Sequence, residues 1–242
     1  MNNALIVIPT YNEQANIQRT VTQAIEAVPE ASILIVDDSS PDGTGDLADF
    51  LSEQYDTVHV LHRAEKNGLG EAYKAGFTWG IVGGFKKFIE MDADGSHHPE
   101  YLPTLINLLD EADMSVGSRY IPGGSTPEWA WHRTKLSSVG NKVAKKLLKT
   151  DVHDISSGFR GYTLEALNRT HYDTAESKGY SFQVEMILRA EQAGLNIVET
   201  PIAFTDRVKG SSKMDYRVLS ETAGRMLKWS IRTRFTKKAV QG

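Results

Sequence analysis

Short apolar runs alternate with amphipathic stretches through the first half of the chain, and this alternation limits the possible folds more than any other feature. Residues 4–8 form an apolar run, and residues 13–28 then place apolar side chains at helical spacing. Further strands are expected at 32–37, 57–61, 87–91 and 114–117, with helices at 46–54, 70–82 and 99–110 between them. Such alternation is typical of a parallel sheet with helices on both faces. We therefore expect an α/β fold with a Rossmann-like, mostly parallel sheet flanked by helices.

The second half of the chain is less regular. Residues 120–134 are rich in Gly, Pro and Trp, whereas helices are expected at 136–148 and 180–193 and a strand at 197–204. A basic helix is expected at the C-terminal end. The length of 242 residues fits one domain, so a single domain over 1–242 is the default expectation.

Composition excludes several classes of protein. A formal charge of -4 and a pI near 6.0 argue against general nucleic-acid binding, which leaves a strongly basic surface. The chain has no cysteine, which excludes disulfides and thiolate metal sites and fits a reducing compartment such as the cytoplasm. No apolar run reaches the roughly 18 residues that a membrane-spanning helix needs. A lipid substrate would therefore have to be met at the membrane surface.

The first two expected strands end in polar segments. Pro-Thr-Tyr-Asn-Glu follows the first strand, where a dinucleotide-binding fold would carry a glycine fingerprint, so a dehydrogenase is not expected. Asp37 and Asp38 end the second strand, and one of these carboxylates could accept hydrogen bonds from a base or ribose. Turn and helix-cap chemistry explains much of this segment as well. Asp38 is the preferred candidate.

The fourth strand leads into a segment with two closely spaced carboxylates. Asp92 and Asp94 lie on the same side of an extended turn and present convergent oxygen donors. Mg²⁺ or Mn²⁺ accepts such donors together with substrate phosphate oxygens, and a cation would relieve the repulsion between the carboxylates. Loop capping is the structural alternative. His97 and His98 could extend a metal site, but a His-Pro pair after a strand more often begins a helix.

Several cations follow downstream and are candidates for phosphate binding, because guanidinium groups bind phosphate with paired hydrogen bonds. They are Arg119, Arg133, Arg160, Lys178, Arg207, Lys209 and Lys213.

Together these segments resemble the polyprenyl- and dolichyl-phosphate mannose synthases, family 2 glycosyltransferases with the GT-A fold. The resemblance spans nearly the whole chain. It rests on the segments at 9–13, 37–44, 67–70, 90–97, 117–120, 154–160, 177–183 and 206–214. The Glu-Met-Asp-Ala-Asp-Gly-Ser-His sequence at 90–97 is more similar to the actinobacterial enzymes than to those with Gln in the third metal-site position, which Ser96 occupies here.

The resemblance implies a role for individual residues. The nucleoside, with guanine as the expected base, would be held by Pro9, Tyr11, Glu13 and Asp38. The divalent ion, Mg²⁺ or Mn²⁺, would be bound by Asp92 and Asp94, with Ser96 in the third metal-site position and Ala93 beside them in the nucleotide-sugar site. The donor diphosphate and the acceptor phosphate would be gathered by Arg119, Arg133, Ser137 and Arg207, with Lys178 and Lys213 as further donor-site residues.

The resemblance also implies the reaction, in which mannose passes from GDP-mannose to polyprenyl phosphate with inversion. A phosphate monoester is mostly dianionic at neutral pH because its second pKa is about 6, so the attack requires no general base. Residues 1–119 would form the nucleotide-sugar half, 120–217 the acceptor half and 218–242 a basic amphipathic helix. Alternatives are transfer of glucose or another sugar, and an inactive glycosyltransferase-like subunit of a membrane complex.

Membrane contact is expected at the cytoplasmic face. In the segment 219–242, six basic residues minus one acidic residue leave a charge of +5, so it could lie on anionic lipid. A helix packed on the domain is the alternative. Trp129 and Trp131 form a second candidate lipid contact, and a separate membrane-anchoring protein is a further expected partner.

Overall fold

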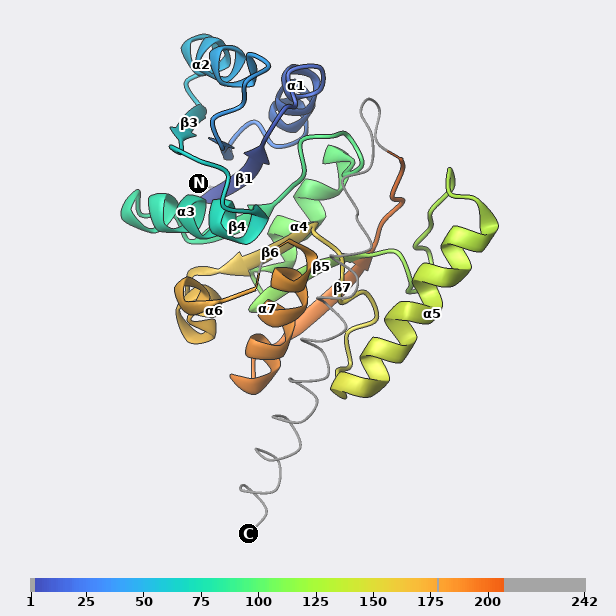
Figure 1. The fold of residues 1–242 in the computed structure, drawn as a ribbon. Helices are drawn as coiled ribbons and strands as arrows, with labels where there is room; N and C mark the ends of the chain where they lie inside the picture. The colour runs from blue at the N-terminus through green and yellow to red at the C-terminus, as the bar shows by residue number, and fades with distance from the viewer. Residues whose placement is uncertain (1–2, 178, 207–242) are drawn as a thin grey trace.

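The computed structural model describes residues 3–177 and 179–206 and shows a 7-stranded sheet (Figure 1). The strands are β1 (Ala4–Thr10), β2 (Ser32–Asp37), β3 (Val58–His62), β4 (Lys87–Glu90), β5 (Met114–Ser118), β6 (Arg160–Thr163) and β7 (Ile197–Pro201). Their order across the sheet is β3-β2-β1-β4-β6-β5-β7. β6 runs antiparallel to both of its neighbours, and the other pairs are parallel. The expected mostly parallel α/β fold is confirmed.

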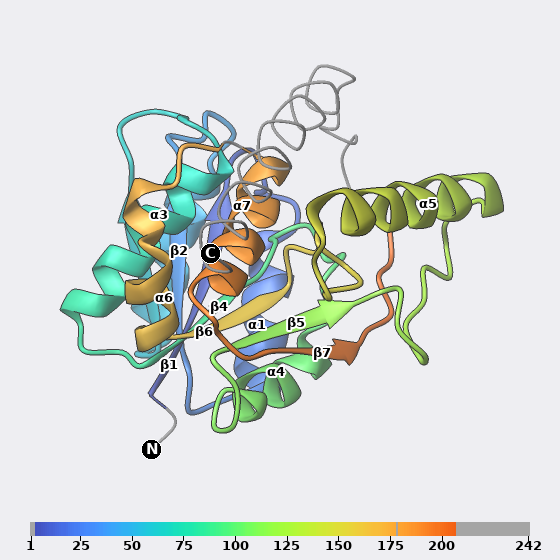
Figure 2. The same ribbon diagram turned by 90° about the horizontal axis from the view of Figure 1, so that it is seen from below.

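Helices cover both faces of the sheet, which explains why its central strands are apolar on both sides (Figure 2). Along β1, Leu5 and Val7 enter one core while Ile6 and Ile8 enter the other. The first core is closed by α3 (Leu69–Val82), α6 (Leu164–Thr170) and α7 (Tyr180–Gln192), and the second by α1 (Ile17–Ala27), α2 (Thr44–Gln54) and α4 (Leu102–Leu108). Two short 3-10 helices, η1 (Pro99–Tyr101) and η2 (Tyr172–Thr174), connect these elements.

The remaining helix, α5 (Trp131–Leu148), lies at the periphery beyond the ends of β5 and β7 (Figures 1 and 2). It begins five residues before the helix expected at 136–148. Only its inner side reaches the core, through residues such as Ala144 and Leu148. The structure therefore leaves a long face of α5 uncovered by any described element.

The sequence patterns did not predict β6 or α6. β6 has only four residues and begins with Arg160, a residue type that is almost never fully buried without partners. Its position between β4 and β5 joins the two halves of the chain in one sheet. Strands from residues 1–119 and from residues 120–206 thus share a single scaffold.

α3 approaches β1 most closely at Gly76. A Cβ at this position would lie 2.4 Å from Val7 Cγ1. We expect Gly76→Ala to lower the free energy of unfolding by about 1–3 kcal/mol, because the core has no room for the added methyl group. Gly140→Ala on α5 is the matched control, since a Cβ there meets nothing within 4 Å, and it should raise stability by up to about 1 kcal/mol. Urea denaturation followed by circular dichroism compares the two, and equal midpoints would contradict the close packing.

Candidate active site

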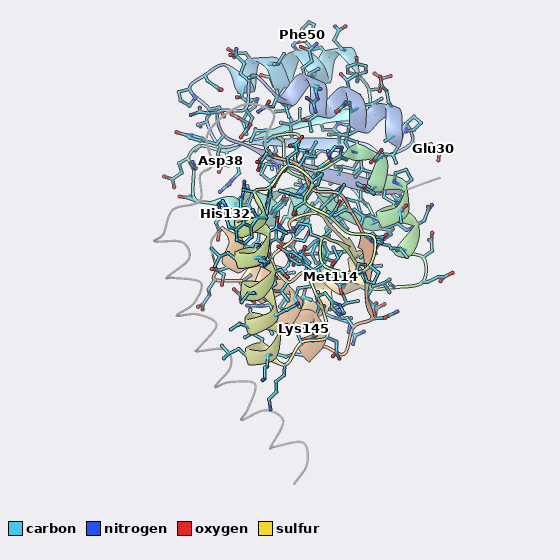
Figure 3. All side chains as sticks on the ribbon, turned by 90° about the vertical axis from the view of Figure 1, so that its right-hand side faces the viewer. Glu30, Asp38, Phe50, Met114, His132 and Lys145 are labelled. Atoms are coloured by element: carbon cyan, nitrogen blue, oxygen red, sulfur yellow. The ribbon has the colours of Figure 1, made fainter. Side chains whose placement is uncertain are left out.

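Three polar turns meet at the carboxyl edge of the sheet, because β1 lies between its parallel partners β2 and β4. The turns follow Thr10, Asp37 and Glu90. In open α/β sheets this edge is the usual place for ligands. Figure 3 shows Asp38 and His132, which lies in the first turn of α5, on the same side of the molecule. The turns that carry the nucleoside and carboxylate candidates are therefore neighbours along this edge.

The turn after β2 separates the roles of its two carboxylates. The Asp37 side chain accepts hydrogen bonds from the hydroxyls of Thr10 at 3.0 Å and Ser40 at 2.6 Å. This carboxylate therefore stabilises the conformation of the loop. Asp38 instead pairs with Arg63 at 2.6 Å. Burial raises the pKa of Asp38, and the positive charge of Arg63 partly offsets this shift. This division of roles favours Asp38 as the ligand-binding carboxylate.

The turn after β1 is held under backbone strain. Asn12 has a φ of 59°, a left-handed conformation that is uncommon for residues other than glycine, and its N–H donates to Ser40 Oγ at 3.0 Å. Ser39 in the neighbouring turn has a φ of 53°. Strain of this kind, fixed by bonds between two loops, is characteristic of ligand-binding edges.

The other nucleoside candidates have different surroundings. Pro9 lies in β1 opposite Val36, and the ring of Tyr11 lies under the Lys66 ammonium at 3.7 Å. Glu13 is buried at the entry to α1, where its carboxylate accepts from Asn16 Nδ2 at 2.9 Å and its N–H donates to Thr44 Oγ1 at 3.0 Å. All three lie on or after β1 at the carboxyl edge of the sheet.

Asp94 is ordered by its own turn. Its Oδ1 accepts hydrogen bonds from the Ser96 hydroxyl at 2.6 Å and the Ser96 N–H at 3.0 Å. The carbonyl of Ala93 accepts from Thr20 Oγ1 at 2.8 Å, which fixes the turn to α1. Ser96 is therefore a residue that orients Asp94.

The imidazole of His97 lies at the centre of the site. Its Nδ1 accepts a hydrogen bond from the backbone N–H of Asp92 at 2.9 Å, and its ring stacks on Phe159 with centroids 4.8 Å apart. Burial lowers the pKa of His97. The carboxylates of Asp92 and Asp94 oppose this shift, whereas the charge of Arg119 adds to it. Because Nδ1 accepts a hydrogen bond, the ring carries its proton on Nε2, which lies 3.9 Å from the Asp92 carboxylate. The His97 ring also packs against Phe204, whose ring contacts the Arg119 guanidinium.

The donor set fits a divalent cation that also binds substrate. Among the described residues there is no cluster of three or more His, Cys, Asp or Glu side chains suited to a metal ion. Asp92 and Asp94 provide two carboxylates at one turn. Mg²⁺ and similar ions are often bound through one or two carboxylates, with waters and substrate phosphates completing the coordination. The site therefore has the donors of a substrate-linked metal centre.

Arg119 forms a bidentate ion pair with a buried carboxylate. Its Nε and Nη2 donate to the two oxygens of Asp154 at 2.7 and 2.8 Å, and its backbone N–H donates to the same carboxylate at 3.0 Å. Asp154 is fully buried, and its backbone N–H donates to Glu199 Oε1 at 3.0 Å. Burial opposes ionisation of Asp154, but the charge and hydrogen bonds of Arg119 outweigh it and lower the pKa of the carboxyl. The guanidinium is thereby fixed in one orientation.

A tryptophan brings the second candidate arginine to the first. The Arg133 guanidinium lies 4.0 Å from the Trp129 ring centroid, and that of Arg119 lies 5.7 Å from it. Arg133 also pairs with Asp206 at 2.7 Å. Trp129 packs edge-on against Phe204, and its Nε1 is buried. Trp129 is only partly buried, with its ring between two guanidiniums, and Trp131 is 72% exposed, so lipid contact of this loop stays a prediction.

Ser137 is connected to Arg119 by a chain of polar side chains. Ser137 Oγ lies 2.6 Å from the Tyr120 hydroxyl, and its carbonyl accepts from Asn141 Nδ2 at 3.3 Å. Asn141 also donates to Ser156 Oγ at 3.2 Å, which in turn accepts from Arg119 at 2.9 Å. The inner side of α5 therefore faces the same cation site as β5.

Arg160 does not belong to this group of cations. It is fully buried and donates to the backbone carbonyls of Ser157, Ile155 and Gln183. The prediction that it binds phosphate is wrong, since all its contacts stabilise the core beneath the site. Nearby, burial raises the pKa of Glu90 to about 7 against the opposing charge of Arg160.

Other candidates cannot be placed. Lys178, Arg207, Lys209, Lys213 and the segment 218–242 lie outside the residues that the structure describes. His98 contacts Thr205 Oγ1 at 3.0 Å, so its ring supports the chain beyond β7.

Sequence reasoning left several site residues without a role. Asp154, Ser156 and Asn141 surround Arg119, and Glu199 supports the turn that carries Asp154. The segment at 154–160 was singled out only as a family-like motif. Its Asp-x-Ser-Ser-Gly spacing was the available signal, but the partner of Asp154 is 35 residues away in the sequence.

The sequence matches the model of the family described as glycosyl transferase family 2 over residues 5–170. Polyprenol monophosphomannose synthase of Mycolicibacterium smegmatis is 46% identical over 232 residues, covering 95% of this chain and 88% of that protein. Undecaprenyl-phosphate mannosyltransferase of Micrococcus luteus is 44% identical over 231 residues, covering 96% and 95%. Both similarities extend across the candidate site.

Solved structures share the fold at low identity. Mannosyl-3-phosphoglycerate synthase from Rubrobacter xylanophilus has a TM-score of 0.67 at 17% identity, covering 97% of this chain and 75% of that chain. A mannosyltransferase from Pyrobaculum calidifontis, in complex with GDP-Man and Mn²⁺, has a TM-score of 0.61 at 14% identity, covering 97% and 64%. At this level of identity the likeness establishes the fold.

Proposed function

Because the chain belongs to glycosyl transferase family 2 and has the GT-A fold, we propose that it transfers mannose from a nucleotide sugar to polyprenyl phosphate. It is a metal-dependent, inverting glycosyltransferase. The observation that carries the proposal is a continuous set of contacts from the Asp92 carboxylate to two arginines. Asp92 lies 3.9 Å from His97, the ring of Phe204 contacts His97, Arg119 and Trp129, and Trp129 lies under Arg133. Such a site can bind a metal-linked diphosphate and a second phosphate side by side.

The donor that we propose is GDP-mannose, which the Pyrobaculum calidifontis enzyme of the same fold binds in its structure. Pro9, Tyr11, Glu13 and Asp38 would hold the nucleoside, because the turns after β1 and β2 place them at one edge. Residues 1–119 would thus form the donor half. We extend this site to Lys178, Arg207 and Lys213, whose assignment rests on the family resemblance alone.

Asp92 and Asp94 would hold the divalent ion, with Ser96 orienting Asp94. When bound, such an ion neutralises charge on the departing diphosphate. We propose Mg²⁺ or Mn²⁺, in agreement with the oxygen donors of the turn and with the Mn²⁺ of the Pyrobaculum calidifontis structure.

Arg119, Arg133 and Ser137 would bind the acceptor phosphate. The lipid phosphate then attacks the anomeric carbon in line with the departing nucleoside diphosphate, and one displacement inverts the configuration. The phosphate needs no general base, because its second pKa is about 6 and it is mostly dianionic at neutral pH. The protein contributes position and charge: the Arg119 guanidinium is held by the buried Asp154 carboxylate, and that of Arg133 pairs with Asp206.

The acceptor is a lipid, so the reaction has to occur at a membrane. No helix of the described residues is both long and apolar enough to cross a bilayer. We propose that the protein works at the cytoplasmic face, since a chain without cysteine fits a reducing compartment. We also propose that a separate membrane protein anchors the enzyme to the bilayer.

The direct test is transfer of labelled mannose from GDP-mannose to polyprenyl phosphate. We expect a lipid-linked product with Mg²⁺ or Mn²⁺ and a loss of at least about 100-fold with excess chelator, because charge on the leaving diphosphate is then not neutralised. Restoring the metal should restore transfer. GDP-glucose and UDP-glucose serve as control donors. Faster transfer of glucose would overturn the choice of sugar, and donor binding with no transfer to any lipid phosphate would indicate an inactive subunit.

A further inference from the structure

The uncovered face of α5 carries a continuous apolar stripe. Five of the seven large hydrophobic side chains that are exposed among the described residues lie on this helix. Leu136, Val139, Val143 and Leu147 are 76%, 56%, 59% and 39% exposed. Their spacing of three and four residues puts them on one side of an α-helix. Single exposed apolar residues are ordinary on protein surfaces, whereas an aligned row marks an interaction site.

A row of lysines runs beside this stripe. At about 100° per residue, Lys135, Lys142 and Lys146 project roughly 60–100° to one side of the stripe, and all three are exposed. No Asp or Glu occurs between residues 131 and 148. The helix is therefore amphipathic, with an apolar row bordered by lysines and no acidic side chain along its length.

The opposite border of the stripe turns toward the cation site. Arg133, Ser137 and Asn141 occupy this side, where Arg133 lies on Trp129 and Asn141 bonds to Ser156. One helix thus carries the proposed acceptor-phosphate residues on its inner side and the apolar stripe on the adjoining outer side. A lipid phosphate reaching Ser137 would have its hydrocarbon chain leading toward that stripe.

We propose that α5 is a membrane-seating helix, which lies in the plane of an anionic bilayer with Leu136, Val139, Val143 and Leu147 among the acyl chains. The inference rests on the proposed function, because the lipid acceptor explains why this face adjoins the phosphate site. Lysines beside an apolar stripe complement anionic headgroups and are typical of helices that lie in a membrane interface. The prediction from sequence had placed membrane contact in residues 219–242 and at Trp129 and Trp131, and it did not include this stripe.

The test is flotation of the full chain with vesicles of equal parts phosphatidylcholine and phosphatidylglycerol. The variant Leu136→Gln/Val143→Gln removes two apolar groups from the stripe and should lower vesicle partitioning by about tenfold or more. Phe50→Gln/Val82→Gln is the matched control, since both side chains are exposed hydrophobics on other elements, and it should bind as the wild type does. Vesicles of phosphatidylcholine alone should bind the wild type less.

Transfer assays separate this proposal from the proposed function. The stripe variant should lose transfer to polyprenyl phosphate in vesicles but keep transfer to a short, water-soluble isoprenyl phosphate. Unchanged flotation of the variant would overturn the role of α5. A wild-type dimer that the variant converts to a monomer in solution, without a change in flotation, would show that the stripe binds a second copy instead. Flotation that depends on the stripe in a protein without any transferase activity would support the membrane seat and refute the proposed function.

Discussion

Replacing Asp92 by alanine is expected to reduce kcat/KM for mannose transfer by about 10²- to 10³-fold or more, even at saturating metal. The reason is that the turn after β4 offers only two carboxylates, and losing one removes half of the protein's charge toward the cation and the diphosphate. Loss of a single preorganised group of this kind typically costs about 100- to 1000-fold. Asp92→Asn should behave similarly, because the amide keeps the shape and loses the charge.

A matched variant distinguishes this effect from a general loss of acidic surface. Asp56→Ala removes an exposed carboxylate between α2 and β3 and should leave kcat/KM unchanged. The Asp92 backbone N–H still donates to His97 in the alanine variant, so the turn should stay folded. Thermal unfolding checks this point. Full turnover of Asp92→Ala with saturating Mn²⁺ would refute the metal assignment.

The sequence was sufficient to predict the parallel part of the sheet, because strands that are buried on both faces consist of continuous apolar runs. Ile33 to Val36 shows this, since successive side chains enter opposite cores. The polar residues after such strands could then be placed at one edge by topology alone. Asp38 and Asp92 were found in this way, and their local surroundings in the structure agree with an edge position.

The sequence was insufficient to predict the role of residues whose bonding partners are distant along the chain. Arg160 looked like a surface cation, but three backbone carbonyls satisfy it inside the core. No local pattern reveals that arrangement, because periodicity reports the face of an element and not its partners. For the same reason α5 was expected as a helix while its exposed stripe was missed: an apolar row predicts burial unless the tertiary structure is known.

The second large effect is expected from Asp154→Asn. This substitution keeps the shape of the side chain but leaves the Arg119 guanidinium, which is 8% exposed, without its carboxylate. Breaking a buried pair of this kind costs about 3–5 kcal/mol, so the free energy of unfolding at pH 7 should fall by roughly that amount. Asp110→Asn is the control: its partner Lys87 lies at 2.7 Å, but Asp110 is 68% exposed, and the cost should stay below about 1 kcal/mol.

The dependence on pH follows from the sign of the shift. Burial opposes ionisation of Asp154, yet Arg119 outweighs it and holds the folded-state pKa below the ordinary value of 3.8. The unfolded chain therefore binds the proton more readily, and the stabilisation is fully present above about pH 5. It is lost as the pH falls through the folded-state pKa. The difference in urea midpoint between wild type and Asp154→Asn should stay constant from about pH 5 to 8 and shrink below about pH 4.

Kinetics can tell whether Asp154 positions Arg119 for the acceptor or only stabilises the fold. If Arg119 binds the lipid phosphate, Asp154→Asn should raise KM for polyprenyl phosphate by about tenfold, the cost of roughly 1.4 kcal/mol, and leave KM for GDP-mannose nearly unchanged. A purely structural loss would lower the amount of active enzyme and leave both KM values as they are. An increase confined to the KM for GDP-mannose would instead assign Arg119 to binding the donor diphosphate. Binding of the acceptor phosphate would then depend on Arg133 and Ser137.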